Sequence, residues 1–160
     1  MDPFLVSVTV CVRDGYDWIS GCLEALRLQT YPAIEILIVN DGSSDDAETL
    51  LGEWNDPEGL NGHPIRVHSQ DQLGLAAGRQ WALKHAKGEW VAITDIDVRP
   101  EQDWITNLVA EIQPVSAEEH VVAVTGRTVF ERAEDLVSRF RSVEIASKYR
   151  SRPRRTSLAN

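Results

Sequence analysis

Apolar and polar positions along the chain follow two alternating patterns. Runs of strand length, β-branched or continuously apolar, are each followed by a stretch with apolar residues at helical spacing. The strand-like runs lie at residues 4–12, 34–40, 65–69, 89–94 and 120–126. The helix-like stretches lie at 16–29, after residue 45, and at 75–85, 101–112 and 136–149. This order predicts an α/β domain with a mostly parallel sheet and right-handed crossovers.

The expected helices carry signals for where they begin, pack and end. The helix at 75–85 offers small and apolar packing residues: Ala76, Ala77, Trp81 and Leu83. Gly88 follows it and is suited to end a helix. Ser44 or Asp45 can cap the helix after the second strand. The continuous apolar run at 34–40 predicts helices on both faces of the sheet.

The composition is that of a globular domain, with 42% hydrophobic and 26% charged residues among 160 positions. No apolar run is long enough to cross a bilayer, and residues 1–12 alternate like a strand rather than matching a signal peptide. We therefore expect a cytoplasmic location. Cys11 and Cys22 lie in apolar contexts without metal-ligand spacing, which favours buried thiols over a disulfide or a zinc site.

Charge is distributed unevenly. The net charge is −9, yet the segment from Arg139 onward is basic and contains a single acid, Glu144. An acidic body repels phosphates, so we expect no nucleic-acid partner. The basic segment suits either a solvated helix face or peripheral contact with anionic lipid or a phosphorylated ligand. We divide the chain into a ligand-binding domain at 1–130 and a basic helix and tail at 131–160.

Polar residues gather where three of the expected strands end. Residues 40–45 follow the second strand, residues 70–79 follow the third, and Asp95 and Asp97 follow the fourth. Ligands of parallel α/β sheets bind beyond the carboxyl ends of the strands. An Asp-Gly turn such as the one at Asp41 is also an ordinary structural feature. Three such ends together indicate a ligand site at this edge.

Asp95 and Asp97 need a cation, because like charges this close repel by several kcal/mol at an effective dielectric constant of about 20. In an extended strand, residues i and i+2 point to the same side, so both carboxylates could face one ion. Hard oxygen ligands favour Mg²⁺ or Mn²⁺ over zinc. Magnesium takes one or two carboxylates and completes its shell with water and phosphates, which predicts a diphosphate as co-ligand.

Asp41 and Arg79 suit other parts of such a ligand. A carboxylate can accept a hydrogen bond from an imino N–H, which uracil and guanine present and cytosine and adenine do not. Small residues at 76–78 permit close approach to a ligand, and Arg79 can offset phosphate charge. The alternative role for Arg79 is that of a surface helix cation.

The order of these motifs resembles the family 2 glycosyltransferases, whose catalytic domain has the Rossmann-like GT-A fold. The resemblance covers about residues 6–126. The similar segments are "VSVTVCVRDGYDWISGCLEALRLQTYP", "EILIVNDGSSD", "GLAAGRQWALKHAKGEW" and "TDIDV". One D-x-D motif alone would be weak evidence, whereas here all four segments occur in the order and at the spacings typical of the family.

The resemblance implies transfer of a sugar from a nucleotide donor, a UDP-sugar, to an unknown sugar, lipid or protein acceptor, usually with inversion. It implies contact of Asp41 with the base. The implied nucleotide-binding residues are Val12, Arg13, Asp14, Asp41, Arg79, Asp95 and Ile96. Asp97, with Asp95 as its partner, would bind Mn²⁺ or Mg²⁺, which stabilises the leaving diphosphate.

The sequence departs from the family pattern at several positions. These are Cys11 and Asp14, where Pro-x-x-Asn is common, Gln80, where Asn is usual, and Val98, where a third acid is frequent. Family members continue into an acceptor-binding half with the catalytic base, and we expect both beyond Asn160. We expect Glu134 and Asp135 to open the basic helix rather than to supply that base.

Other functions remain open from the sequence. A non-catalytic nucleotide-binding module would keep the same residues. A receiver-type phosphoacceptor domain is also α/β, but it needs an acidic pair after the first strand and a lysine after the last, and neither is present. A sugar-nucleotide pyrophosphorylase needs a Gly-rich basic loop after its first strand, which "VRDGYDW" does not supply.

Overall fold

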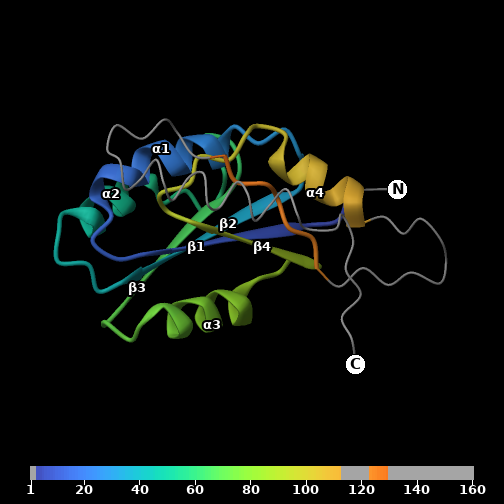
Figure 1. Cartoon of the computed structure of the whole chain (residues 1–160). Helices are drawn as coiled ribbons and strands as arrows, with labels where there is room; N and C mark the ends of the chain where they lie inside the picture. The colour runs from blue at the N-terminus through green and yellow to red at the C-terminus, as the bar shows by residue number, and fades with distance from the viewer. Residues whose placement is uncertain (1–2, 113–122, 130–160) are drawn as a thin grey trace, which may run out of the picture. The chain divides into compact units, whose positions relative to one another are not determined.

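The computed structural model describes residues 3–112 and 123–129 (Figure 1). The chain divides into two compact units, Met1–Val121 and Val122–Asn160, and all helices and strands named below belong to the first. The expected strand at 120–126 is wrong for residues 123–126, because they form no ladder with another described strand. Residues 120–122 and the expected basic helix at 136–149 lie outside the described residues.

A four-stranded sheet forms the centre of the first unit. Its strands are β1 (Val6–Val12), β2 (Ile34–Asp41), β3 (Ile65–Gln70) and β4 (Trp90–Asp95). Their spatial order is β3-β2-β1-β4, and every neighbouring pair is parallel. The register pairs Val12 with Asn40 and Cys11 with Asp95. The carboxyl ends of the strands therefore meet at one edge, as the sequence predicts.

Helices cover both faces of this sheet. They are α1 (Tyr16–Arg27), α2 (Ala47–Trp54), α3 (Leu75–His85) and α4 (Trp104–Ile112). Figure 1 shows α1, α2 and α4 on one face and α3 on the other. All of β2 is buried, because it is an inner strand with helices above and below it. Among the described residues, no helix has the length and apolar character needed to cross a bilayer.

The main core lies between the sheet and α1, α2 and α4. It is built by alternate residues of β1 and β2 and by the apolar side of α1: Val6, Val8, Val10, Val12, Ile34, Ile36, Ile38, Ile19, Leu23 and Leu26. Burying each such side chain contributes roughly 1.5–3 kcal/mol. These contacts fix the orientation of β1 and β2, and therefore where their carboxyl ends lie.

The packing of α3 differs from the sequence-based expectation. Gly78 and Ala82 are its buried residues, whereas Ala76 and Leu83 are exposed. A Cβ on Gly78 would lie 3.1 Å from Cys11 Sγ, so the helix lies close to the sheet at that point. The prediction that Ala76 and Leu83 pack inward is wrong. The helix faces the sheet with Gly78, which has no side chain and so allows close approach, rather than with its more apolar residues.

Gly88 does not end α3 as expected. The helix ends at His85, and Ala86 continues in an extended conformation. A Cβ on Gly88 would lie 2.6 Å from the Ser7 nitrogen and 2.7 Å from the Leu5 oxygen. Gly88 therefore lies where the chain passes too close to β1 for a side chain, just before β4 begins.

The last described helix starts later than expected, at Trp104 rather than at residue 101. The carbonyl oxygens of Glu101 and Gln102 accept hydrogen bonds from Gln29 Nε2 at 2.7 Å and from the Thr30 N–H at 2.8 Å. The Glu101 carbonyl also accepts the Trp104 N–H at 2.9 Å, so residues 101–103 form a turn before the helix begins.

Candidate functional site

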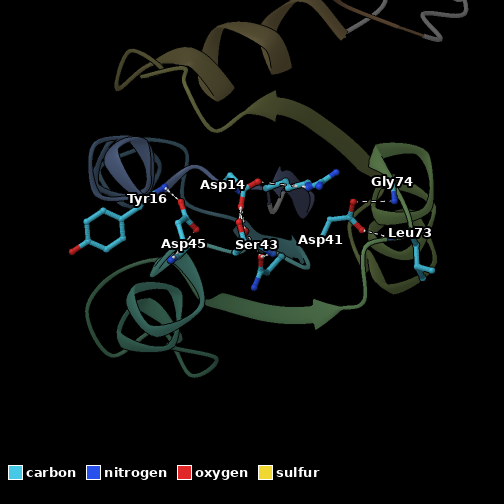
Figure 2. Close-up of polar contacts among 11 residues, drawn as sticks. Asp14, Tyr16, Asp41, Ser43, Asp45, Leu73 and Gly74 are labelled. Atoms are coloured by element: carbon cyan, nitrogen blue, oxygen red, sulfur yellow. Dashed lines mark hydrogen bonds and ion pairs between the residues drawn. The ribbon is translucent and has the colours of Figure 1, made fainter.

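The loops after β1 and β2 are bound to each other through Asp14. Its N–H donates to Ser43 Oγ at 3.1 Å, and its Oδ1 accepts from the Ser44 N–H at 2.7 Å and the Ser44 hydroxyl at 3.0 Å (Figure 2). The Ser44 N–H holds the pKa of Asp14 below its ordinary value. Asp14 has a φ of 50°, in the left-handed region that Asp and Asn tolerate better than most residues.

Asp45 connects the first turns of two helices. Its Oδ2 accepts the Tyr16 N–H at 3.0 Å, and its Oδ1 accepts the Ala47 N–H at 3.1 Å. The N-cap of α2 is Asp46, which makes no capping hydrogen bond, so the expectation that Ser44 or Asp45 caps this helix is wrong, although Asp45 accepts the first helical N–H. The Tyr16 ring points away from these loops (Figure 2). Asn40 Oδ1 accepts from the Ser43 N–H and hydroxyl at 3.2 and 2.6 Å, so the whole 40–45 turn is preformed.

Asp41 holds the loop between β3 and α3. Its Oδ1 accepts from Gln70 Nε2 at 2.7 Å and the Leu73 N–H at 2.8 Å, and its Oδ2 accepts the Gly74 N–H at 2.9 Å (Figure 2). The Gln70 amide, followed by the two backbone donors, holds the pKa of Asp41 below its ordinary value. A carboxylate has about four lone-pair sites, so one acceptor position on Oδ2 is left for a ligand.

Arg79 and Asp95 form an ion pair across the carboxyl edge, with 3.2 Å between the guanidinium Nη2 and Oδ1. Arg79 comes from α3 and Asp95 from the last position of β4. Their side chains are 39% and 64% exposed, and an exposed pair contributes only about 0–1 kcal/mol. The cation that the sequence requires beside Asp95 is therefore Arg79 in this structure, held weakly enough to be exchanged.

Asp97 lies in the turn after β4 and is exposed. The Val98 N–H donates to the backbone carbonyl oxygen of Asp95 at 3.1 Å and closes this turn. Because β4 ends at Asp95, the expectation that strand geometry points both carboxylates to one side is wrong. Across the described ranges there is no cluster of three or more His, Cys, Asp or Glu residues that could hold a metal. Two adjacent carboxylates are nevertheless the number that Mg²⁺ takes when phosphates and water complete its shell.

Val12, Arg13 and Ile96 occupy different surroundings. The Val12 side chain is in the core, where Ile96 packs against it and Gly15. Arg13 is exposed, and its Nε lies 3.8 Å from Asp14 Oδ2. The structure thus brings Arg13 and Asp14 together at the carboxyl end of β1, while the Val12 side chain is buried and the Ile96 side chain is partly buried.

Cys11 belongs to this edge, although sequence reasoning assigned it to the core. It is partly buried and free, and burial raises the pKa of its thiol. Arg79 opposes this rise in pKa, whereas the negative charges of Asp41 and Asp95 add to it. Its register opposite Asp95 is the signal that could have located it, but that pairing is not visible in the sequence. Cys22 is buried as expected, which raises the pKa of its thiol to about 12.

A cavity of about 480 Å³ opens at the carboxyl ends of β2 and β3. It is lined mostly by polar residues: Asn40, Gly42, Glu48, Ser69, Gln70 and Asp71. Its volume lies within the range of roughly 300–1,000 Å³ found for small-molecule sites. Asp41, Arg79, Asp95 and Asp97 do not line this cavity, so the candidate site consists of the Asp41 network and the Arg79, Asp95 and Asp97 group at the carboxyl edge.

Known proteins resemble this chain in sequence and in structure. Glycosyltransferase GlyA from Streptococcus pneumoniae is 30% identical over 131 residues, which are 82% of this chain and 18% of GlyA. The crystal structure of Staphylococcus aureus TarS 1–349 in complex with UDP-GlcNAc has a TM-score of 0.59 and 25% identity, over 68% of this chain and 31% of that one. A mannosyltransferase from Pyrobaculum calidifontis, in complex with GDP-Man and Mn²⁺, has a TM-score of 0.62 and 27% identity, over 69% and 32%.

The chain thus spans less than a third of these proteins' lengths. The resemblance in structure includes the parallel sheet and flanking helices of GT-A glycosyltransferases. The family model described as "Glycosyl transferase family 2" matches residues 7–158. This chain belongs to glycosyl transferase family 2.

Proposed function

We propose that the chain is the donor-binding part of a glycosyltransferase that transfers a sugar from a UDP-sugar to an acceptor. The observation that carries this proposal is the meeting of a hydrogen-bonded acceptor, Asp41, with the Arg79, Asp95 and Asp97 group at one sheet edge. A base, a diphosphate and a cation are the three parts that these groups suit. The solved complex of TarS with UDP-GlcNAc supports a uridine donor.

Asp41 would recognise the base through its remaining acceptor position. An imino N–H of uracil or guanine can donate to Oδ2, whereas cytosine and adenine would place an unprotonated ring nitrogen there. The mismatch would leave a buried acceptor without its partner, which costs about 1–3 kcal/mol. Titration with UDP, GDP, CDP and ADP tests this step: UDP should bind most tightly, and equal affinity for UDP and CDP would contradict it.

Asp97 and Asp95 would hold Mn²⁺ or Mg²⁺. When bound, this ion would stabilise negative charge on the leaving diphosphate. Asp97 makes no side-chain hydrogen bond or ion pair with any described residue, so its lone pairs are available. Arg79 would move its positive charge from Asp95 toward the phosphates. The neighbour solved with GDP-Man and Mn²⁺ supports the fit of metal and nucleotide to this fold.

We further propose that transfer inverts the anomeric centre. The acceptor oxygen would attack the anomeric carbon opposite the diphosphate, the carbon–oxygen bond to phosphate would break toward the diphosphate, and a base would take the acceptor's proton. Residues 1–130 would form the donor site. The basic residues at 139–155 lie outside the described residues, and their contact with anionic lipid stays a proposal, for which flotation with anionic and neutral vesicles is the test.

A non-catalytic nucleotide-binding module would bind UDP equally well. Release of UDP from a UDP-sugar separates the two functions, because only an enzyme breaks the glycosidic bond. We expect metal-dependent UDP release from a UDP-sugar in the presence of an acceptor. Binding of UDP without any release, with a range of sugar and lipid acceptors, would favour the binding module.

A further inference from the structure

The turn that carries Asp97 is held in place through its neighbours, since no described residue bonds to the Asp97 carboxylate. The turn is closed by the hydrogen bond from the Val98 N–H to the backbone carbonyl oxygen of Asp95. The position of the carboxylate in space therefore depends on what supports residues 96–102. That support is provided by α1 and the turn that follows it.

Two glycines bring this segment against α1. A Cβ on Gly15 would lie 3.3 Å from Ile96 Cγ2, so Ile96 packs directly on the backbone that precedes the helix. A Cβ on Gly21 would lie 2.6 Å from Arg99 Nε and 3.2 Å from its Cζ. The Arg99 guanidinium thus occupies the place that a side chain at position 21 would fill. These atoms are the far end of a flexible, exposed side chain, so the contact does not by itself require a glycine at position 21.

Gln29 anchors the far end of the same segment. It is 5% exposed, its Nε2 donates to the Glu101 oxygen at 2.7 Å, and its Oε1 accepts the Ile105 N–H at 3.1 Å. Its Nε2 also donates to the Ala25 oxygen at 3.2 Å. An amide side chain donates and accepts at once, so Gln29 bonds both the end of the segment and the start of α4.

The contacts follow the same order along both partners, from Ile96 at Gly15, through Arg99 at Gly21, to Glu101 at Gln29. The segment that carries Asp97 is therefore held at both ends, by Ile96 at Gly15 and by Glu101 at Gln29.

We propose that Gln29 is a positioning residue for the donor's metal site, because it anchors the end of the segment that carries Asp97. This proposal rests on the proposed function, in which Asp97 binds the metal. Gln29 is not among the residues proposed to bind the donor or the metal. Small displacements of a positioned ligand are costly, because binding depends on geometry held within about 0.5 Å.

The role of Gln29 is tested through metal-dependent binding of the donor nucleotide. The measured quantity is the ratio of UDP dissociation constants in EDTA and in Mn²⁺. We expect this ratio to fall by about threefold or more when the Gln29 anchor is removed. A wild-type ratio would overturn the role of Gln29.

Gln29→Leu tests the anchor, with Gln102→Leu as control, because the exposed Gln102 side chain makes no hydrogen bond with the described residues. Gln29→Leu should lower the same ratio while affinity in EDTA changes little; an equal loss in both conditions would show a merely structural role. Hydrogen exchange at the amides of residues 96–105 is a readout without metal, and it should accelerate in Gln29→Leu alone. If wild-type UDP binding is metal-independent, the proposed metal function fails, while unchanged exchange would overturn the positioning itself.

Discussion

Asp41→Asn is the substitution for which the structure predicts the clearest loss of stability. The carboxylate accepts three hydrogen bonds between 2.7 and 2.9 Å, from Gln70, Leu73 and Gly74. An asparagine oxygen can replace only one carboxylate oxygen, and its NH₂ group would face an N–H donor. Hydrogen bonds to a charged group contribute about 1.5–3 kcal/mol and neutral ones about 0.5–1.5 kcal/mol, so one lost and two weakened bonds should cost about 3 kcal/mol.

Urea denaturation followed by tryptophan fluorescence measures this change in the free energy of unfolding. In a domain of this size, about 3 kcal/mol corresponds to a melting temperature lowered by roughly 6–12 °C. Asp71→Asn is the control, because its exposed side chain lies in the same loop and has no hydrogen bond with the described residues. Equal stability of the two variants would refute the role of Asp41 as the holder of the β3–α3 loop.

The lowered pKa of Asp41 adds a pH dependence. Its folded pKa lies below the ordinary 3.8 of an unfolded aspartate, so its contribution to stability is present above 3.8 and is lost as pH falls through the folded pKa. We expect the stability difference between wild type and Asp41→Asn to shrink on acidification in this window. A difference that stays constant down to pH 2 would contradict this assignment.

Three further predictions follow from neighbouring contacts. Glu35→Gln should lose about 3 kcal/mol of unfolding free energy, because the buried carboxylate binds a serine hydroxyl, a backbone N–H and an arginine; a loss below about 1 kcal/mol in chemical denaturation would contradict this. Iodoacetamide should label Cys11 before Cys22, because Cys22 is buried, which raises the pKa of its thiol to about 12. Mass spectrometry of the labelled peptides measures the order, and earlier labelling of Cys22 would contradict this prediction. Arg79→Met should raise Mn²⁺ affinity without nucleotide by up to about fivefold, since the ion pair with Asp95 is exposed, and unchanged affinity in calorimetry would show that Arg79 does not compete.

The architecture was predictable because local patterns determine it. The continuous apolar run of β2 reflects burial on both faces, and the bounds of α3 match the expected 75–85. The packing of α3 was not predictable, because its contact with the sheet depends on Gly78, which carries no hydrophobic signal. The strand expected at 120–126 failed over residues 123–126, since an alternating apolar pattern does not by itself supply a pairing partner.

The candidate site was predictable as a set of residues but not as a set of contacts. Strand-end polarity located Asp41, Arg79, Asp95 and Asp97 at one edge. The pairing of Arg79 with Asp95 depends on how α3 packs on β1 and β2, and the bonds of Asp41 depend on a loop some thirty positions later along the chain. Cys11 was missed because a thiol in an apolar run looks like core until the register is known.

The central claim, a donor site in which Asp97 binds the metal, is tested most directly by calorimetric titration of UDP in Mn²⁺ and in EDTA. The variants are Asp97→Asn and Glu111→Gln, which removes an exposed carboxylate from α4 and serves as the control. Wild type and Glu111→Gln should bind UDP about tenfold or more tightly with Mn²⁺, whereas Asp97→Asn should lose most of that gain. Equal UDP affinity of the wild type in Mn²⁺ and in EDTA, or a full metal effect in Asp97→Asn, would contradict the claim.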